Sequence, residues 1–299
     1  WNTGGKMSAK IISGKEVAAA IREELKLRAQ KLKEKGVVAG LGVILVGEDP
    51  ASVSYVTAKA KAAEEIGIFE ETVRLPGDAS EEEILKNVDR LNRDQRFHGV
   101  LVQLPLPKWV NPDKVINFIS PEKDVDGFHP VNVGKLLRGE PCPLPCTPYG
   151  IQQMLVRSGY SPEGQHVVIC GRSNIVGKPL AALLMQKKPG ANATVTVCHT
   201  GTRDIKKHTL QADILVAAMG APKVITADMV REGCVVIDVG VNRVPDPAAA
   251  KGFRLVGDCD FEAIKEKAAA ITPVPGGVGP MTVTMLMMNT IEAAERSLS

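Results

Sequence analysis

The chain lacks the features that would place it in a membrane or on a nucleic acid. No window in its 299 residues approaches the roughly 18 uninterrupted apolar residues that a bilayer-spanning helix needs. Lys and Arg total 37 against 34 Asp and Glu, and the resulting charge of +3 is spread without a dense basic block. We therefore expect no membrane association and no nucleic-acid partner, and we expect a small molecule as the ligand.

A zinc-ligand pattern is also missing. Of the six cysteines, Cys142 and Cys146 form a C-x3-C pair with no second Cys or His pair at zinc-ligand spacing. Four others lie in apolar or strand-like runs, where a thiol behaves as a small hydrophobe. We expect these two cysteines in a loop, no metal site, and a reducing, cytoplasmic compartment. Residues Trp1–Lys6 lack secretory or transit character and are expected to be a tag or tail.

The first half of the chain alternates between strand-like and helical patterns. Hydrophobic residues make up 44% and charged residues 24% of the chain, as in folded globular proteins. Short apolar runs predict strands at Leu41–Val46 and His98–Gln103. Helical spacing of apolar residues predicts helices at Lys15–Lys33, Ser52–Gly67 and Ser80–Arg93, the last opening with a capping box. The expected order after the first helix is β, α, β, α, β.

The second half repeats the alternation after a proline-rich stretch that indicates a domain junction. Two doubly wound α/β domains flanking a cleft are therefore expected, the second of them a Rossmann-type nucleotide-binding domain. Their predicted bounds are 7–148, completed by a Met-rich C-terminal helix at 281–299, and 149–280. Predicted strands are Gln165–Cys170, Thr194–Cys198, Ile214–Ala218 and Val235–Val239, and predicted helices are Val176–Gln186 and Pro280–Ser299.

A glycine-containing turn, Gly171–Gly177, follows a predicted strand and opens a helix, which is where dinucleotide folds bind a pyrophosphate. It departs from G-x-G-x-x-G because Ser173 occupies the second glycine position and the last glycine comes one residue late, so a plain β–α turn remains the alternative. The next strand ends at His199–Thr200 without an acidic residue for a ribose hydroxyl, which favours NADP. Arg172 can reach a 2′-phosphate, the alternative being a solvated loop arginine.

Polar side chains also gather at the expected carboxyl edge of the first sheet. Tyr55 and Lys59 are spaced i, i+4 on the helix after the first strand, so both project from one face. A lysine desolvated there can exchange protons, and Gln103, at the end of a strand, can accept its hydrogen bond. Asp124 and Asp126 alternate, so only one of them faces a given side, and a loop carboxylate there can pair with an amino-pyrimidine edge. A solvated helix face and an ordinary Asp-Gly turn are the alternatives.

Six sequence patterns then occur in one order. Together they resemble the bifunctional methylenetetrahydrofolate dehydrogenase/cyclohydrolases, and the resemblance extends from about Ala9 to the C-terminus. The patterns are Tyr55-x3-Lys59, Val102–Pro107 (VQLPLP), Lys123–Phe128 (KDVDGF), Gly171–Pro179 (GRSNIVGKP), Val236–Gly240 (VIDVG) and Thr272–Thr282 (TPVPGGVGPMT).

The resemblance implies hydride transfer from methylenetetrahydrofolate to NADP, then hydrolysis of the methenyl product to formyltetrahydrofolate, in one cleft of a homodimeric enzyme. Lys59 would move a proton or tune the cation in the second step, with Gln103 modulating it, Tyr55 orienting the folate rings and Asp126 holding the pterin. The first domain would bind folate and the second NADP. The implied folate contacts also include Val102, Leu104, Pro275, Gly276, Gly277 and Val278, and the implied NADP contacts are Gly171, Arg172, Ser173, Thr200 and Val241.

Two other functions stay open from the residues alone. A dehydrogenase of the same fold acting on another substrate, such as an amino or keto acid, would leave the Gly276–Gly277 loop unexplained. A catalytically silent nucleotide-binding protein would bind NADP and turn over no folate. The joint presence of all the polar site residues speaks against the silent protein.

Overall fold

The computed structural model describes residues 8–249 and 252–298, so the expected tag or tail at Trp1–Lys6 lies outside the described residues. The chain divides into two compact units. The three-stranded unit comprises Ala19–Cys146 and the chain from Val283 onward. The six-stranded unit comprises the chain up to Ala18 and Thr147–Thr282. Both boundaries near the chain ends fall within helices, α1 (Gly14–Glu34) and α10 (Val278–Arg296).

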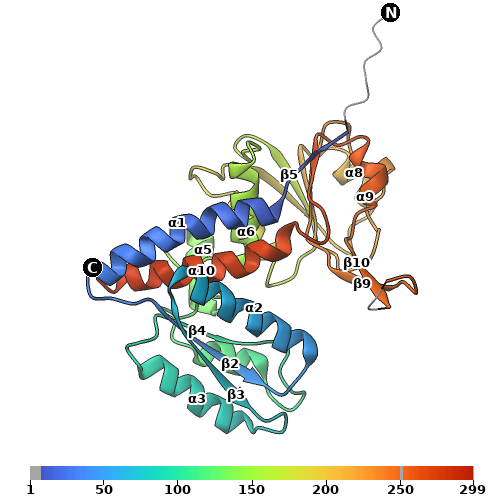
Figure 1. The fold of residues 1–299 in the computed structure, drawn as a ribbon. Coiled ribbons are helices and arrows are strands. Elements are labelled where there is room, and N and C mark those ends of the chain that lie inside the picture. The colour runs from blue at the N-terminus through green and yellow to red at the C-terminus, as the bar shows by residue number, and fades with distance from the viewer. Residues whose placement is uncertain (1–7, 250–251, 299) are drawn as a thin grey trace, which may run out of the picture. The chain divides into compact units, whose positions relative to one another are not determined.

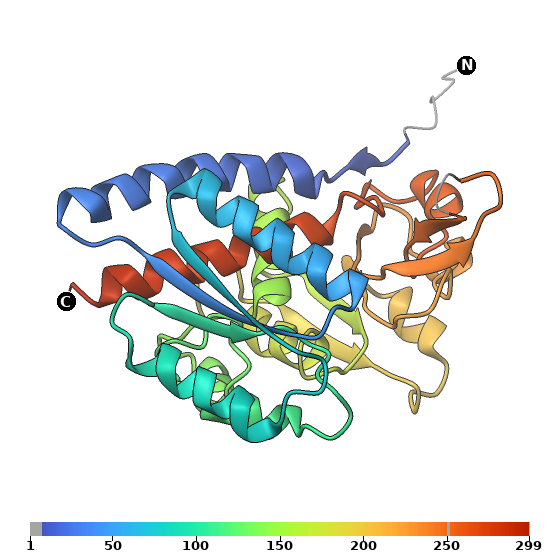
Figure 2. The ribbon, with the colours of Figure 1, turned by 60° about the horizontal axis from the view of Figure 1, so that its bottom comes forward.

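The three-stranded unit contains a parallel sheet in the order β3 (Phe69–Leu75), β2 (Gly40–Val46), β4 (Gly99–Val102). The central strand β2 is buried along its whole length, as its continuous apolar run predicted. The crossover helices α2 (Pro50–Ile66) and α3 (Glu81–Arg93) cover opposite faces of this sheet (Figures 1 and 2). Right-handed crossovers to strands on either side of β2 require that arrangement.

Local sequence signals explain where these two helices begin and end. Asp49 accepts a hydrogen bond from the backbone N–H of Ser52 at 2.8 Å, and α2 ends at Gly67, which adopts a φ of +90°. Ser80 caps α3 by accepting from the N–H of Glu83 at 3.1 Å. The predicted helices and strands of this unit are therefore confirmed to within about two residues.

Three helices after β4 were not predicted: α4 (Pro112–Phe118), α5 (Pro130–Arg138) and α6 (Cys146–Arg157), the last of which lies almost wholly in the six-stranded unit. Each carries a proline in its first turn, where the missing N–H costs no hydrogen bond. Of the prolines in the predicted domain junction, only Pro148 lies in a helix, α6. The expectation of loop cysteines is thus wrong for Cys146, which is buried at the start of α6, while Cys142 is only half-buried. The remaining four cysteines are buried.

The six-stranded unit contains a parallel sheet in the order β1-β11-β8-β7-β5-β6. Four of its strands were predicted, which confirms the parallel α/β class, whereas the two-residue strands β1 and β11 are too short to show periodicity. The strands are β1 (Lys10–Ile11), β5 (His166–Cys170), β6 (Thr194–Cys198), β7 (Ile214–Ala217), β8 (Val235–Asp238) and β11 (Ala270–Ile271). Helices α7 (Gly177–Leu184), α8 (Ile205–Thr209) and α9 (Phe261–Lys265) follow strands of this sheet or its hairpin along the chain. The unit also contains a 3-10 turn at Ala227–Met229 and an unpredicted antiparallel hairpin of β9 (Asn242–Pro245) and β10 (Phe253–Val256).

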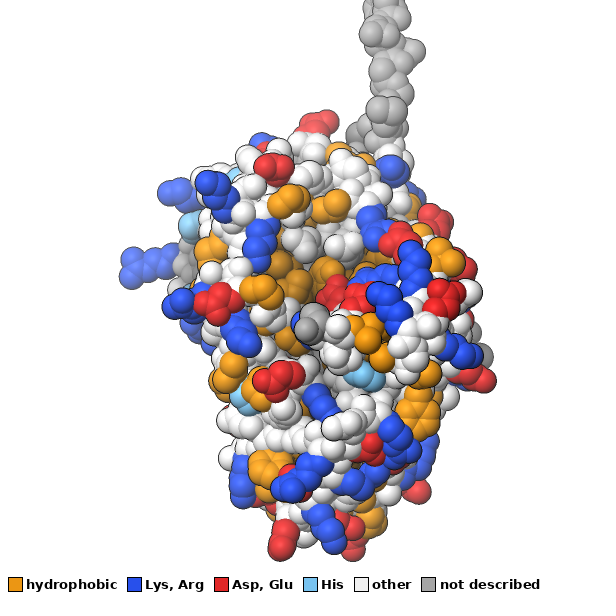
Figure 3. Space-filling view, turned by 90° about the vertical axis from the view of Figure 1, so that its left-hand side faces the viewer, with side chains coloured by type: hydrophobic (Ala, Val, Ile, Leu, Met, Phe, Trp, Pro, Cys, Tyr) orange, Lys and Arg blue, Asp and Glu red, His pale blue; other side chains and the backbone are white. Residues whose placement is uncertain are grey.

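The surface agrees with the even charge distribution of the sequence. On the face drawn in Figure 3, acidic and basic side chains are interspersed. Within residues 8–249 and 252–298, none of the helices has both the length and the apolar character needed to cross a bilayer.

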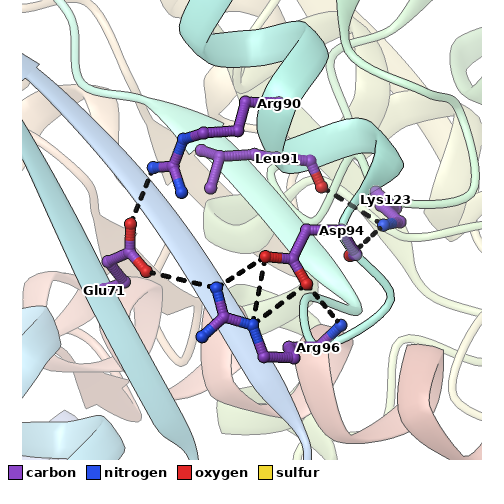
Figure 4. Close-up of polar contacts among 6 residues, drawn as sticks. All are labelled: Glu71, Arg90, Leu91, Asp94, Arg96 and Lys123. Atoms are coloured by element: carbon purple, nitrogen blue, oxygen red, sulfur yellow. Dashed lines mark hydrogen bonds and ion pairs between the residues drawn. The ribbon is translucent and has the colours of Figure 1, made fainter.

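A half-buried lysine closes the C-terminal end of α3. The Lys123 ammonium donates to the carbonyl oxygens of Leu91 at 3.2 Å and Asp94 at 2.9 Å, and burial lowers its pKa (Figure 4). The neighbouring Asp94 carboxylate accepts from Arg96 at 2.6 Å, and this hydrogen bond lowers the pKa of Asp94 to about 2. Lys123 therefore satisfies carbonyls that the end of a helix leaves without intrahelical partners.

We expect the substitution Lys123→Met to lower the free energy of unfolding by about 1–3 kcal/mol, because the carbonyls of Leu91 and Asp94 lose a half-buried donor. Urea denaturation followed by circular dichroism measures the change. Lys86→Met, on the exposed face of α3, is the matched control and should leave the midpoint unchanged. Equal midpoints for both variants would show that Lys123 does not stabilise this helix end.

Candidate active site

A lysine and a glutamine meet at the carboxyl edge of the three-stranded sheet. Lys59 lies on α2, which follows β2, and Gln103 comes directly after β4. The Lys59 Nζ donates to the Gln103 Oε1 at 2.9 Å, and the Gln103 Nε2 donates to the carbonyl oxygen of Leu104 at 2.7 Å. Both ends of the amide are thus occupied, so its oxygen must face the lysine. The hydrogen bond expected from the sequence is present, while the catalytic roles of both residues stay predictions.

Tyr55 lies one helical turn before Lys59 and is 53% exposed. An exposed aromatic ring at the edge of a parallel sheet offers a flat apolar surface to a planar ligand. Of the other expected folate contacts in this unit, Leu104 is half-buried, whereas Val102 is buried and its side chain packs in the core beneath the sheet edge.

The two alternating aspartates have different surroundings. Asp124 is buried and accepts backbone hydrogen bonds from Gly127, Phe128 and His129 at 2.8–3.3 Å, so it shapes the turn. Asp126 is only partly buried. Desolvation raises the pKa of Asp126, the Lys59 cation lowers it, and the Asp124 carboxylate raises it further. Asp126 lines a small cavity together with Val102 and Leu104 at the carboxyl end of β4, the strand that Gln103 follows.

Two buried residues that the sequence did not single out support the Asp126 segment. Asn289 on α10 donates through its Nδ2 to the carbonyl oxygens of Val125 and Leu144, each at 2.8 Å. The Cys146 thiol donates to the Val125 carbonyl at 3.4 Å, and burial followed by the nearby Asp126 carboxylate raises the pKa of Cys146. The one available sequence signal was an asparagine inside the apolar run Met285–Ile291.

The glycine-rich loop belongs to the six-stranded unit. Gly276 has a φ of +102° and its carbonyl accepts from the N–H of Lys15 at 3.2 Å. A Cβ on Gly277 would lie 2.5 Å from the carbonyl oxygen of Pro273, so internal packing alone already requires glycine there. Pro275 is exposed, and α10 begins at Val278, two residues before the predicted start at Pro280, so Val278 is buried in the first turn of the helix rather than in the loop.

The turn after β5 has the tight geometry of a dinucleotide-binding turn. Gly171 has a φ of +138°, and a Cβ there would lie 2.1 Å from the carbonyl oxygen of Ala218. A Cβ on Gly177 would lie 2.1 Å from the Gly171 carbonyl oxygen, so the glycine that comes one residue late still allows close helix–strand packing. Ser173 replaces the second glycine of the motif. Its Oγ accepts hydrogen bonds from the backbone N–H groups of Val176 at 3.1 Å and Gly177 at 3.4 Å.

The other candidate NADP contacts lie at the same carboxyl edge. Arg172 and Thr200 are exposed just beyond β5 and β6, whose last residues pair in register, and Val241 is 54% exposed just beyond β8. Neither His199 nor Thr200 carries a carboxylate that would repel a 2′-phosphate. The tight turn, the exposed guanidinium and the absence of an acidic side chain at 199–200 fit NADP.

Comparison with protein-family models matches both parts of the chain. The tetrahydrofolate dehydrogenase/cyclohydrolase catalytic domain matches residues 12–126, and the NAD(P)-binding domain of the same family matches residues 145–298. The chain belongs to the tetrahydrofolate dehydrogenase/cyclohydrolase family. The resemblance inferred from the sequence is thereby confirmed.

Relatives within the tetrahydrofolate dehydrogenase/cyclohydrolase family match nearly end to end. Bifunctional protein FolD of Dehalococcoides mccartyi (strain CBDB1) is 59% identical over 98% of this chain and 99% of its own length. Bifunctional protein FolD of Syntrophus aciditrophicus (strain SB) is 60% identical over 97% of this chain and 99% of its own length. The crystal structure of FolD from Campylobacter jejuni is 46% identical with a TM-score of 0.91, covering 97% of this chain and 100% of that one. The crystal structure of FolD from Trypanosoma brucei, in complex with NADP and an inhibitor, is 40% identical with a TM-score of 0.91, covering 98% of this chain and 99% of that one.

Proposed function

We propose that this chain oxidises 5,10-methylenetetrahydrofolate to 5,10-methenyltetrahydrofolate with NADP and hydrolyses the product to 10-formyltetrahydrofolate. The observation that carries the proposal is the Lys59–Gln103 hydrogen bond beside Asp126, within a member of the tetrahydrofolate dehydrogenase/cyclohydrolase family. The three-stranded unit binds the folate and the six-stranded unit binds NADP. The enzyme acts as a homodimer in the reducing cytoplasm.

The proposed chemistry divides between positioning and proton transfer. NADP, when bound, accepts the hydride from a methylene carbon whose two flanking nitrogens stabilise the resulting cation. Tyr55 and Asp126 hold the folate, the first by stacking against the rings and the second by accepting hydrogen bonds from the pterin. The loop at Pro275–Val278 completes the folate contacts, with backbone rather than side chains at Gly276 and Gly277.

Hydrolysis needs an acceptor for a proton of the attacking water. The amine of Lys59, beside the bound methenyl group, is the residue proposed to take that proton. Gln103 accepts one N–H of Lys59 and so directs the nitrogen lone pair, because its other end is held by the Leu104 carbonyl. The water oxygen bonds to the methenyl carbon as one water proton passes to Lys59. The bond from that carbon to N5 then breaks and N5 takes up a proton, while the remaining O–H proton leaves to form the formyl C=O on N10.

A coupled spectrophotometric assay tests the whole proposal. Methylenetetrahydrofolate is mixed with the enzyme and NADP or NAD in parallel; reduced nucleotide should accumulate faster with NADP, and added methenyltetrahydrofolate should decay faster than without enzyme. Activity on an amino or keto acid without folate would support the alternative dehydrogenase. NADP binding without any absorbance change would support the silent nucleotide-binding protein.

The proposed role of Asp126 makes folate binding sensitive to acid. Because the carboxylate must be ionised to accept two hydrogen bonds and its pKa is raised, the KM for methylenetetrahydrofolate should rise as pH falls through that raised pKa, by about tenfold for each unit below it. Steady-state kinetics from neutral to mildly acidic pH measures this rise. Asp126→Asn should raise the KM at neutral pH and make it nearly independent of pH. A wild-type KM as flat as that of the variant would contradict the role.

A further inference from the structure

A carboxylate without a cationic partner is buried at the carboxyl edge of the six-stranded sheet. Asp258 has no exposed surface, and among the described residues it forms no ion pair. Its Oδ2 accepts from the N–H groups of Met219 at 2.6 Å and Gly220 at 2.9 Å. Its Oδ1 accepts from the N–H of Ala221 at 3.1 Å and from the Nδ2 of Asn242 at 2.9 Å. Four neutral donors therefore surround the buried carboxylate, and these hydrogen bonds fix the positions of the donor groups.

The donors belong to two loops that leave the sheet at the same edge. Met219–Ala221 follows β7, and Asn242 follows β8 directly after the exposed Val241. Ala218, just before the first loop, is the residue whose carbonyl oxygen lies against Gly171 in the turn after β5. One carboxylate thus fixes the backbone of two loops, and the first of them contacts the turn of the candidate nucleotide site.

A second buried aspartate interlocks with the first. Asp238, the last residue of β8, accepts from the N–H groups of Gly240, Asp258 and Cys259 at 2.9–3.0 Å. A Cβ on Gly240 would lie 2.1 Å from the Asp258 Oδ1, and one on Gly257 would lie 1.8 Å from the Asp238 Oδ2. Each carboxylate therefore occupies the space beside a glycine of the other segment, so a side chain at either glycine would displace it.

The strand order tells which part of a dinucleotide these loops face. In Rossmann sheets the pyrophosphate lies at the first βα turn and the adenine ribose at the end of the next strand. Here those positions are the turn after β5 and the end of β6, and β7 and β8 lie on the other side of β5. The nicotinamide half of the cofactor must therefore extend over the loops that Asp258 holds.

We propose that Asp258 is a positioning residue for the nicotinamide half of NADP, acting by fixing the backbone of Met219–Ala221 and of the loop containing Val241. The proposal rests on the NADP-dependent function put forward above. The carboxylate touches no ligand itself. It sets the place of the groups that do, and it leaves the adenosine end of the cofactor to Arg172 and Thr200.

Isothermal titration of the full-length chain with two ligands tests this division. In Asp258→Asn, an amide N–H₂ replaces one acceptor oxygen and faces backbone N–H groups, so NADP affinity should fall about tenfold or more. Affinity for 2′,5′-ADP, which has no nicotinamide half, should stay within about twofold of the wild type. The KM for NADP should rise with little change in the KM for folate. Asp260→Asn, which alters a half-buried aspartate two residues on that pairs with Lys223, should change neither affinity.

Equal weakening of NADP and 2′,5′-ADP, or no change in either, would overturn the assignment. Should Asp258→Asn fail to fold, Asn242→Ala removes only the contact to the β8 loop and should shift the NADP affinity in the same direction by about threefold. An unchanged ratio of the two affinities in that variant would also overturn it. Failure of the proposed function is distinguishable, because the wild-type chain would then show no NADP-dependent oxidation of the folate.

Discussion

Replacing Lys59 with alanine should reduce cyclohydrolase activity by about a thousandfold while NADP affinity stays at the wild-type value. The physical reason is local. The Lys59 Nζ is the group that Gln103 holds at 2.9 Å at the sheet edge, and alanine leaves water without a proton acceptor there. Decay of added methenyltetrahydrofolate measures the loss, and isothermal titration measures NADP binding.

Lys61→Ala is the matched control for this experiment, because Lys61 lies two residues along α2 with an exposed side chain. It should retain both activities. A Lys59→Ala protein that lost dehydrogenase and cyclohydrolase activity equally, or lost NADP binding, would refute the proton-transfer role and indicate a general effect on folate binding or folding.

The second large effect is expected at Gly171. Gly171→Ala places a Cβ 2.1 Å from the Ala218 carbonyl oxygen, at a φ of +138° that L-residues rarely adopt, so the turn must move. We expect NADP affinity to fall at least about a hundredfold, since the turn brings the backbone to the pyrophosphate. Titration with NADP measures the loss directly.

Cyclohydrolase activity serves as the internal control for Gly171→Ala, since this hydrolysis consumes no nucleotide and reports whether the chain is folded. Gly134→Ala is the matched substitution elsewhere: it lies in α5, and nothing is within 4 Å of the added Cβ. NADP binding by Gly171→Ala at wild-type strength would show that the turn does not hold the cofactor.

The parts of the fold that sequence predicted well are those with a strong local signal. Parallel strands buried on both faces are continuous apolar runs, so Leu41–Val46 could be read as a strand without knowing its neighbours. The Met-rich C-terminal segment was expected to pack against another element, and Met281, Met285, Met287 and Met288 are indeed buried. Ser80 identified the start of α3 because capping depends on residues three apart.

The parts that sequence missed depend on partners far along the chain. The strands β1 and β11 have two residues each and exist only because they extend a sheet that other strands establish. A proline that starts a helix, as in α4 and α5, cannot be told from a proline in a loop by local sequence alone. Only the tertiary structure distinguishes the two cases.

The candidate site shows the same division. Tyr55, Lys59 and Gln103 could be predicted as site residues because spacing and position at strand ends carry a signal, whereas the choice of Asp126 over Asp124 came from the family resemblance. Asp258 and Asn289 were not, because each acts on backbone groups of distant segments, and a backbone N–H or C=O leaves no trace in the sequence.

The distribution of thiols has a practical use. Since five cysteines are buried and Cys142 is half-buried, a maleimide dye should react first at that single position, in the segment between α5 and α6. The native chain thereby offers one preferred attachment point for a fluorescent reporter, without prior removal of the other sulfhydryl groups.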